Sequence, residues 1–296
     1  MLEIMLSSGG KGRSRPPSNT WGSLRVGPPA RNQAVLASTG SKIYLFGGVN
    51  NGVNLQDLWE YTPSTDTWEK KVNGQAIRQI CAVGVGNFIY VFGGYTTAVQ
   101  KSLRRYDTIN NVWVILTDAP VARAAGGITA IGNKLYIFGG SGTGSTNDLW
   151  CYDIVTNTWG QLASGSANRY AYGLASLGNK LYVYGGGLTA APGGRVKDLW
   201  SYDTIDDVWT RLADGLFTYI NAFLGVHGDK LYLSGARADG SLIPMSRYDP
   251  VLNTWMELSP GPSFRYDQAM TMNNGQFYMF GGYSSVSLND FWAYTA

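Results

Sequence analysis

One short row of residues returns six times in this chain and constrains its fold more than any other feature. In the row, apolar residues stand directly before a pair of glycines, the second of which is alanine in one copy. The copies are IYLFGG (43–48), IYVFGG (89–94), LYIFGG (135–140), LYVYGG (181–186), LYLSGA (231–236) and FYMFGG (277–282). The first glycines stand at 47, 93, 139, 185, 235 and 281, so the steps are 46, 46, 46, 50 and 46 residues. A fixed period of this length indicates one supersecondary unit repeated in tandem.

Two further signatures complete each unit. The first follows the glycines as DLWEY (57–61), LRRYD (103–107), DLWCYD (148–153), DLWSYD (198–203), MSRYD (245–249) and DFWAY (290–294). The second is a tryptophan segment, found as DTW (66–68), NVW (111–113), NTW (157–159), DVW (207–209) and NTW (253–255). With the apolar stretch before each glycine row, every unit predicts four short strands separated by turns.

The strands that end in glycine are apolar at successive positions, which predicts burial on both faces. Sheets stacked radially around an axis provide that burial. The sixth unit ends at Ala296 without a tryptophan segment, and NTWGSL (19–24) supplies it, with Trp21 lying 47 residues before Trp68. We therefore predict an all-β fold, a six-bladed β-propeller of four-stranded antiparallel blades, closed by the N-terminal strand completing the last blade. The propeller is expected over 19–296, after a flexible tail over 1–18.

The Gly-Gly pairs, the Tyr-Asp pairs and the spaced tryptophans resemble the Kelch repeat family over about residues 19–296. The resemblance implies the same propeller. Kelch propellers include protein-binding modules, carbohydrate-active enzymes and metal-dependent proteins, so the fold alone does not assign a function.

Charge and composition remove several classes of function. The net charge of this 296-residue chain is +3, and the first eighteen residues contribute +2 of it through Lys11, Arg13, Arg15 and Glu3. The remainder is nearly neutral, which argues against a nucleic-acid partner. We also expect no membrane partner, because no apolar run approaches the length of a membrane span. The N-terminus shows no signal peptide, so we expect a cytoplasmic monomer, with secretion after removal of a signal as the open alternative.

Metal and cofactor chemistry has few candidate residues. His227 is the one histidine of the chain, so a site that needs two histidine ligands is excluded. Cys81 and Cys151 fit neither a zinc spacing nor a disulfide framework. We expect no metal, no cofactor and no assigned catalytic residue.

An antiparallel meander brings the loops after Gly-Gly and the starts of the first strands to one face. Arginines stand sixteen residues before the first glycine in four units, fifteen before it in the second, and the fifth unit has tyrosine; these residues are Arg31, Arg123, Arg169, Arg265, Arg78 and Tyr219. They predict a ring around one mouth of the central channel, where guanidinium groups would bind carboxylates or phosphates. The alternative is that each arginine is a structural device of the repeat, hydrogen-bonded to carbonyls of the neighbouring blade.

The family resemblance supports a binding mouth. In Kelch domains of ubiquitin-ligase adaptors, arginines that open the first strand and aromatics just after Gly-Gly bind acidic peptides. Tyr95 and Tyr283 match the position after the glycines, Arg237 matches its arginine variant, and the five arginines match the strand-opening position. The BTB and BACK segments of such adaptors are not in this sequence, so the resemblance implies only the use of the mouth.

The fifth unit departs most from the repeat, which is either ordinary drift or a second indication of a site. A ligand on this side would meet Tyr170, Tyr219, Asn221, Arg237, Tyr266 and Asp267. Tyrosines beside amide and charged groups suit a sugar or small polar ligand.

The sequence predicts a binding module that holds an acidic peptide or small anionic ligand at this mouth, rather than an enzyme. One alternative is a cofactor-free, epimerase- or mutarotase-like enzyme on an acidic sugar, with Asp267 as base and Tyr219 or Tyr266 as acid. The other is a bare repeat scaffold without a small ligand.

Overall fold

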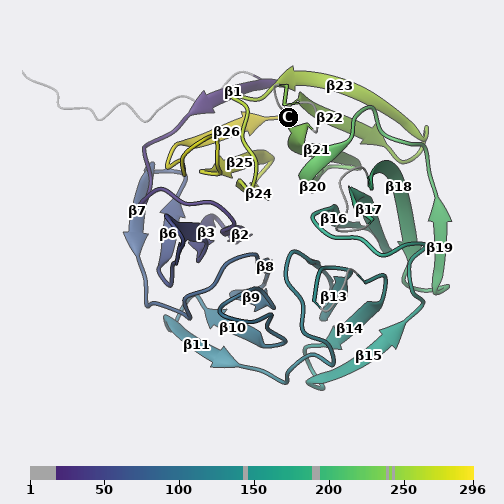
Figure 1. Ribbon diagram of the computed structural model, residues 1–296, viewed down its shortest axis with the longest axis horizontal. Coiled ribbons are helices and arrows are strands. Elements are labelled where there is room, and N and C mark those ends of the chain that lie inside the picture. Colours follow the sequence, from purple (N-terminus) through teal and green to yellow (C-terminus); the bar gives the residue numbers. More distant parts are fainter. Residues whose placement is uncertain (1–17, 143–145, 189–193, 238–239, 242–243) are drawn as a thin grey trace, which may run out of the picture.

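The computed structural model describes residues 18–142, 146–188, 194–237, 240–241 and 244–296. The described residues form strands and turns and contain no helix. The strands make six four-stranded antiparallel sheets around a central axis, with the innermost strand of each sheet beside the channel (Figure 1). The predicted six-bladed propeller is therefore confirmed, whereas the expected tail over 1–18 lies almost wholly outside the described residues.

Each of the first five blades runs from the channel to the rim in chain order. The strands of the first three blades are β2 (Val35–Thr39), β3 (Lys42–Phe46), β6 (Leu58–Thr62), β7 (Thr67–Lys70); β8 (Cys81–Val85), β9 (Phe88–Phe92), β10 (Leu103–Asp107), β11 (Val112–Ile115); β12 (Gly127–Ile131), β13 (Lys134–Phe138), β14 (Leu149–Asp153), β15 (Thr158–Leu162). Those of the next two are β16 (Gly173–Leu177), β17 (Lys180–Gly187), β18 (Arg195–Asp203), β19 (Val208–Arg211); β20 (Tyr219–His227), β21 (Lys230–Arg237), β22 (Pro244–Asp249), β23 (Thr254–Pro260). A short hairpin of β4 (Val49–Asn50) and β5 (Val53–Asn54) follows the first glycine pair.

The sixth blade is assembled from both ends of the chain. It contains β24 (Ala269–Asn273), β25 (Gln276–Phe280), β26 (Phe291–Thr295) and, as its outer strand, β1 (Thr20–Ser23). Trp21 pairs with Tyr294 in the antiparallel ladder, and their ring centroids are 5.4 Å apart. The predicted closure by the segment 19–24 is thus present, and it pairs the edge of β26 that would otherwise be open.

A recurring side-chain lock fixes the turn before each outer strand. An Asn or Asp stands there in the left-handed backbone conformation, which these residues tolerate best. Its side-chain oxygen accepts a hydrogen bond from the tyrosine hydroxyl of the adjacent strand, as between Tyr248 and Asn253 at 2.6 Å. Asn253 also accepts the backbone N–H of Ala213, which lies after the preceding blade. In the closing blade Tyr294 donates to Asn19 at 3.2 Å, so the N-terminal segment carries the same lock.

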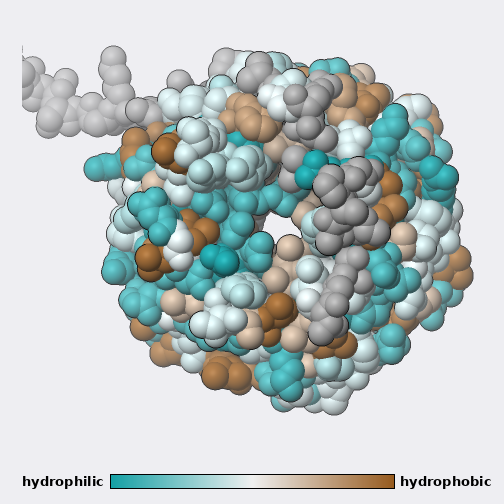
Figure 2. Space-filling model, viewed as in Figure 1, coloured by the Kyte–Doolittle hydropathy of each residue, from teal (hydrophilic) through white to brown (hydrophobic). Residues whose placement is uncertain are grey.

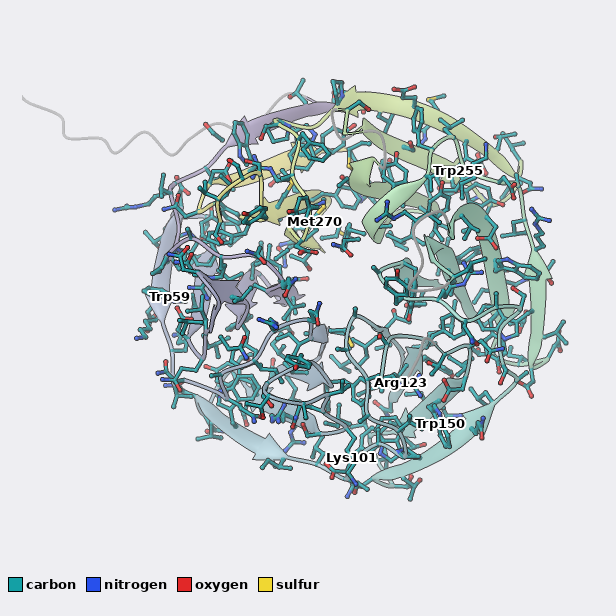
Figure 3. All side chains as sticks on the ribbon, viewed as in Figure 1. Trp59, Lys101, Arg123, Trp150, Trp255 and Met270 are labelled. Carbon is teal, nitrogen blue, oxygen red and sulfur yellow. The ribbon has the colours of Figure 1, made fainter. Side chains whose placement is uncertain are left out.

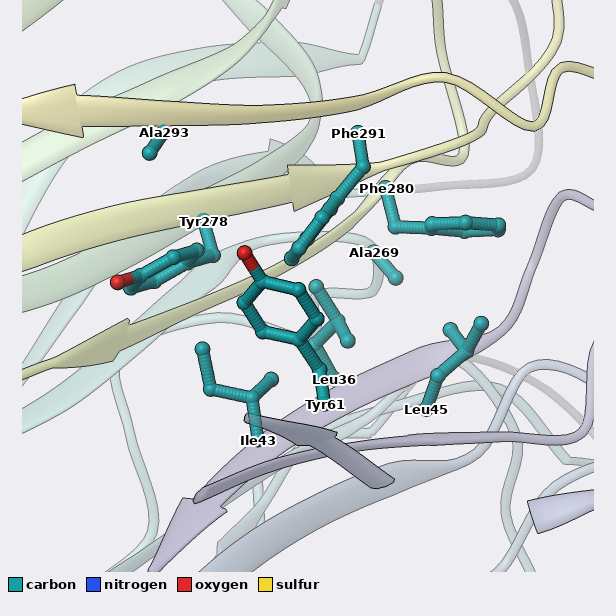
Figure 4. Close-up of a cluster of buried hydrophobic side chains, with 9 residues drawn as sticks. All are labelled: Leu36, Ile43, Leu45, Tyr61, Ala269, Tyr278, Phe280, Phe291 and Ala293. Carbon is teal, nitrogen blue, oxygen red and sulfur yellow. The ribbon is translucent and has the colours of Figure 1, made fainter. Parts of the chain in front are cut away.

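The core lies between blades rather than within one. Between the sixth and first blades, Tyr61 stands edge-on to Phe291 at 4.8 Å, beside Leu45 and Tyr278 (Figure 4). The residues of β3 from Ile43 to Phe46 are all buried, as expected for a strand covered on both faces.

The glycine pair lets neighbouring blades approach closely. Gly47 and Gly48 have φ of 65° and 97°, a conformation that favours glycine. A Cβ on Gly47 would lie 2.6 Å from the carbonyl oxygen of Ile77 in the next blade. The repeated glycines are therefore required by the packing of one blade on the next.

Trp21→Ala tests the closure. Because Trp21 joins β1 to the closing blade through Tyr294, we expect the free energy of unfolding to fall by about 3 kcal/mol in urea titrations. Trp159→Ala is the matched control, since Trp159 makes the same contact with Tyr152, at 4.9 Å, in a blade whose strands are contiguous in the chain. A loss below about 0.5 kcal/mol for Trp21→Ala, beside a full loss for Trp159→Ala, would contradict the closure.

Candidate functional site

Four of the predicted mouth arginines lie inside the blades. Arg31, Arg123, Arg169 and Arg265 are only 1–2% exposed. Figure 3 shows Arg123 set back among the strands of its blade, whereas Met270 borders the central opening. Their guanidinium groups therefore do not line the channel mouth.

Each of these arginines is held by an aspartate of its own blade. Arg123 donates from Nη1 and Nη2 to the two oxygens of Asp148, at 2.9 and 2.6 Å. It also donates to the carbonyl oxygen of Gly139, at 2.7 Å. The aspartate opens the Leu-Trp or Phe-Trp signature, and the corresponding pairs are Arg31–Asp57, Arg169–Asp198 and Arg265–Asp290. The arrangement matches the structural role left open above, except that the accepting carbonyl belongs to the same blade and not to its neighbour.

The pairs also shift the ionisation of the aspartates. Burial by itself would raise the pKa of Asp57, Asp148 and Asp290, but hydrogen bonds from the paired arginine and the nearby indole N–H lower the pKa below its usual value. Their contribution to stability is therefore present above the unfolded pKa near 3.8 and is lost as the pH falls through the folded pKa.

The second blade lacks this pair. The N–H of Gly48 in the first blade donates to the carbonyl of Ile77, and the N–H of Gly94 in the second blade donates to the carbonyl of Arg123. Ile77 therefore has in the second blade the position that Arg123 has in the third. The carbonyl of Ser102 accepts a hydrogen bond from the N–H of Gly93, and the carbonyl of Asp148 accepts the equivalent bond from Gly139 in the third blade. Ser102 therefore has the position of the paired aspartate. The second blade thus lacks both members of the arginine–aspartate pair. Arg78 is one residue closer to its first glycine than the other four arginines are to theirs, so it does not occupy the position of a paired arginine.

Arg78 consequently faces a different environment from the other four. Its backbone bridges that of Tyr95, and its Cζ lies 5.1 Å from the centroid of the Tyr95 ring. Among the described residues no carboxylate pairs with it, and its Nε has no hydrogen-bond partner. Arg78 is therefore the predicted mouth arginine whose charge is uncompensated in the described part of the chain.

Aromatic residues occupy the equivalent bridge in two other blades. Tyr266 bridges Tyr283, and their ring centroids are 5.3 Å apart. The backbone of Tyr170 bridges that of Gly187. A Cβ added to Gly187 would lie 2.7 Å from the Tyr170 ring, so the tyrosine ring covers the glycine. The predicted tyrosines therefore lie at this bridge in three blades: Tyr95 in the second, Tyr170 in the fourth, and Tyr266 and Tyr283 in the sixth.

One residue of the predicted irregular side differs from expectation, and the side chain of another is not described. Tyr219 is fully buried, with its hydroxyl 3.4 Å from that of Ser246, so it contacts the core and not the mouth. Arg237 ends β21, but its side chain lies outside the described residues.

Figure 2 shows the central channel as an opening through the disc. The channel contains a cavity of about 260 Å³, lined by the starts of the inner strands. Six residues lie at equivalent positions around it with φ between 50° and 57°: Gln33, Gln79, Ala125, Ala171, Asn221 and Asp267. Their backbones are hydrogen-bonded from blade to blade, for example from the Gln33 N–H to the Asp267 carbonyl at 2.9 Å. No sequence pattern reveals this ring, because the six side chains share no chemistry.

Asp267 is held at the cavity by two amides. Gln33 donates to its Oδ2 at 3.0 Å, and Asn221 donates to its Oδ1. Burial raises the pKa of Asp267 and outweighs the lowering effect of both hydrogen bonds. The structure therefore brings together Asn221 and Asp267 of the predicted irregular side, and adds Gln33, which the sequence analysis did not identify.

Across the described ranges, no three His, Cys, Asp or Glu side chains are grouped so as to hold a metal ion. Burial raises the pKa of the Cys81 thiol to about 12, so it is protonated at neutral pH. The same described ranges contain no helix that is long and apolar enough to cross a membrane.

Variants of one arginine–aspartate pair test its structural role. Arg123→Ile and Asp148→Ser each leave a charge without its partner, and we expect each to cost about 3 kcal/mol of unfolding free energy. The double variant reproduces Ile77 and Ser102 of the second blade, so its cost should be smaller than the sum by about 2 kcal/mol. Urea titrations of the four proteins measure this coupling, and additive losses would refute it.

Asp267→Asn tests the buried carboxylate. Because its folded pKa is raised, Asp267 destabilises the fold progressively as the pH rises from near 3.8 through the folded pKa. Asparagine suits the left-handed backbone. Its oxygen can accept one of the two amide N–H groups, and its NH2 can donate to the oxygen of the other amide once that amide turns over. We therefore expect the variant to gain stability relative to the wild type as the pH rises from about 4 to 7. A difference between the two proteins that is independent of pH would contradict the assignment.

Comparison with known proteins gives the family. A family model described as the KLHDC2/KLHL20/DRC7 Kelch-repeats domain matches residues 15–120 and 80–282. Kelch domain-containing protein 3 of Rattus norvegicus and that of Mus musculus are each 32% identical to the chain over 83 residues. These matches cover 26% of this chain and 22% of each relative, about a fifth of the relatives' own length. Because the family matches extend over most of the six blades, the chain belongs to the Kelch-repeat family.

Proposed function

We propose that this Kelch propeller is a protein-binding module that holds an acidic segment of its partner at the channel mouth. Kelch propellers generally bind proteins, which supports the general role. The acidic segment is inferred from one observation: Arg78 presents a guanidinium group for which the described residues supply no carboxylate. The four other predicted arginines are left out of the binding surface, because their own blades neutralise them.

The position of Arg78 suits a carboxylate from outside. The Arg78 guanidinium lies over the Tyr95 ring, a cation–π contact that leaves its N–H groups able to donate hydrogen bonds. A carboxylate of the partner would then accept two parallel N–H bonds, the geometry in which arginine binds most strongly.

Aromatic residues supply the second part of the surface. The partly exposed Tyr266–Tyr283 pair lies in the blade before the first, and Arg78–Tyr95 lies in the blade after it. An extended segment crossing the mouth would contact both pairs, with its acidic group at Arg78. Tyrosines at such positions contribute contact area at a low cost in side-chain entropy.

The enzyme alternative receives less support. Its proposed acid, Tyr219, is buried against Ser246, and its proposed base, Asp267, is hydrogen-bonded to Gln33 and Asn221. An acidic sugar would also place its negative charge beside the Asp267 carboxylate.

Fluorescence anisotropy with two labelled decapeptides tests the proposal. One contains four glutamates in a Gly-Ser-Tyr background, and the other has glutamine in their place. We expect tighter binding of the glutamate peptide, weakened by salt. Arg78→Ala should weaken it roughly tenfold, the equivalent of about 1.5 kcal/mol for a charged hydrogen bond.

Arg211→Ala is the matched control, because Arg211 is an exposed arginine of the outer strand β19. It should leave peptide binding unchanged. Equal affinity for the two peptides, or equal effects of the two arginine variants, would reject the acidic segment and favour the bare scaffold.

A further inference from the structure

The cavity of the central channel carries a negative charge that the binding surface at Arg78 does not explain. Asp267 is the one charged side chain among the described residues that line the cavity. No lysine or arginine is paired with it in the described part of the chain. We propose that this cavity binds an alkylammonium group, held by the Asp267 carboxylate while its hydrocarbon body contacts the channel wall.

The carboxylate is oriented but not neutralised. Gln33 and Asn221 donate one hydrogen bond to each of its oxygens, which fixes the plane of the group. Each oxygen retains capacity for another donor, since an ionised carboxylate offers about four acceptor sites. Neither amide carries charge, so the electrostatic cost of the buried anion is left for a ligand to offset.

A second polar group at the wall is unsatisfied. Both the Nε2 and the Oε1 of Gln268 are buried without a hydrogen-bond partner among the described residues. Gln268 follows Asp267 in the chain and lines the same cavity. Buried amides without partners are rare in folded proteins, and a ligand that donates hydrogen bonds would satisfy its oxygen.

The remaining wall suits a short hydrocarbon. Ile128, Leu174, Phe223 and Met270 line the cavity beside the polar groups. Its volume of about 260 Å³ corresponds to roughly nine water molecules at the density of the liquid. The space therefore fits a small amine, or a lysine side chain that enters from the mouth.

Titration by ligand-observed NMR with n-butylammonium, and with n-butanol as its neutral counterpart, tests the proposal. We expect saturable binding of n-butylammonium at least tenfold tighter than that of n-butanol. Asp267→Asn should remove this preference and leave n-butanol binding unchanged. Asp118→Asn is the matched control, because Asp118 is an exposed carboxylate paired with Lys101, and it should keep the preference.

A second arm separates the two sources of the ammonium group. It uses acetyl-Gly-Lys-Gly-amide and the same peptide with norleucine in place of lysine. Tighter binding of the lysine peptide than of n-butylammonium identifies a protein side chain as the ligand, and the reverse order identifies a free amine.

The proposal is overturned if the wild type binds n-butylammonium no tighter than n-butanol, or if Asp267→Asn retains the preference. Should Asp267→Asn fail to fold, Ala125→Leu replaces it. Ala125 also lines the cavity, so this change fills space while it keeps the carboxylate. It should weaken n-butylammonium at least tenfold, and unchanged affinity would equally overturn the proposal.

Discussion

Each blade of this propeller has two apolar faces that only its neighbours can cover, and the rest of the structure depends on this requirement. A strand such as β3, buried from Ile43 to Phe46, would expose one face if the ring were open. The first and last blades must therefore pack together, as Tyr61 and Phe291 do. Closure through β1 adds two further contacts to this packing: the pairing of β1 with β26, and the hydrogen bond from Tyr294 to Asn19. The other blades have the equivalent contacts.

Close packing of blades also decides where charge is placed. In four blades a buried arginine donates a hydrogen bond to the carbonyl of the first glycine of the pair, and an aspartate of the same blade neutralises the arginine. A pattern of repeated arginines in the sequence therefore reflects an internal pairing, which leaves little net charge at the mouth. The second blade has the buried Ile77 at the position of the arginine and Ser102 at that of the aspartate. A blade can therefore pack at this place without the arginine–aspartate pair.

The sequence predicts the blades better than it predicts the site, for a physical reason. Strand order, the number of blades and closure by 19–24 follow from apolar runs, glycines and tryptophans that are local in the chain. The arginine–aspartate pairs join residues 25 to 29 positions apart, and nothing local distinguishes Asp148 from an exposed aspartate. The ring of left-handed residues at the channel is held by backbone hydrogen bonds, so glutamine, alanine, asparagine and aspartate serve equally and leave no common signature.

Departures from the repeat are therefore more informative about function than the repeat itself. A residue present in most blades serves a contact that most blades make, as Arg123 does with Asp148. Arg78 and Asp267 stand where other blades have uncharged residues, such as Ala124 at the bridge position and Ala125 at the ring position. Neither has an oppositely charged partner in the described part of the chain, and the folded blades gain no ion pair from either. Blade packing therefore does not account for either charge, and both proposed binding sites rest on these two departures from the repeat.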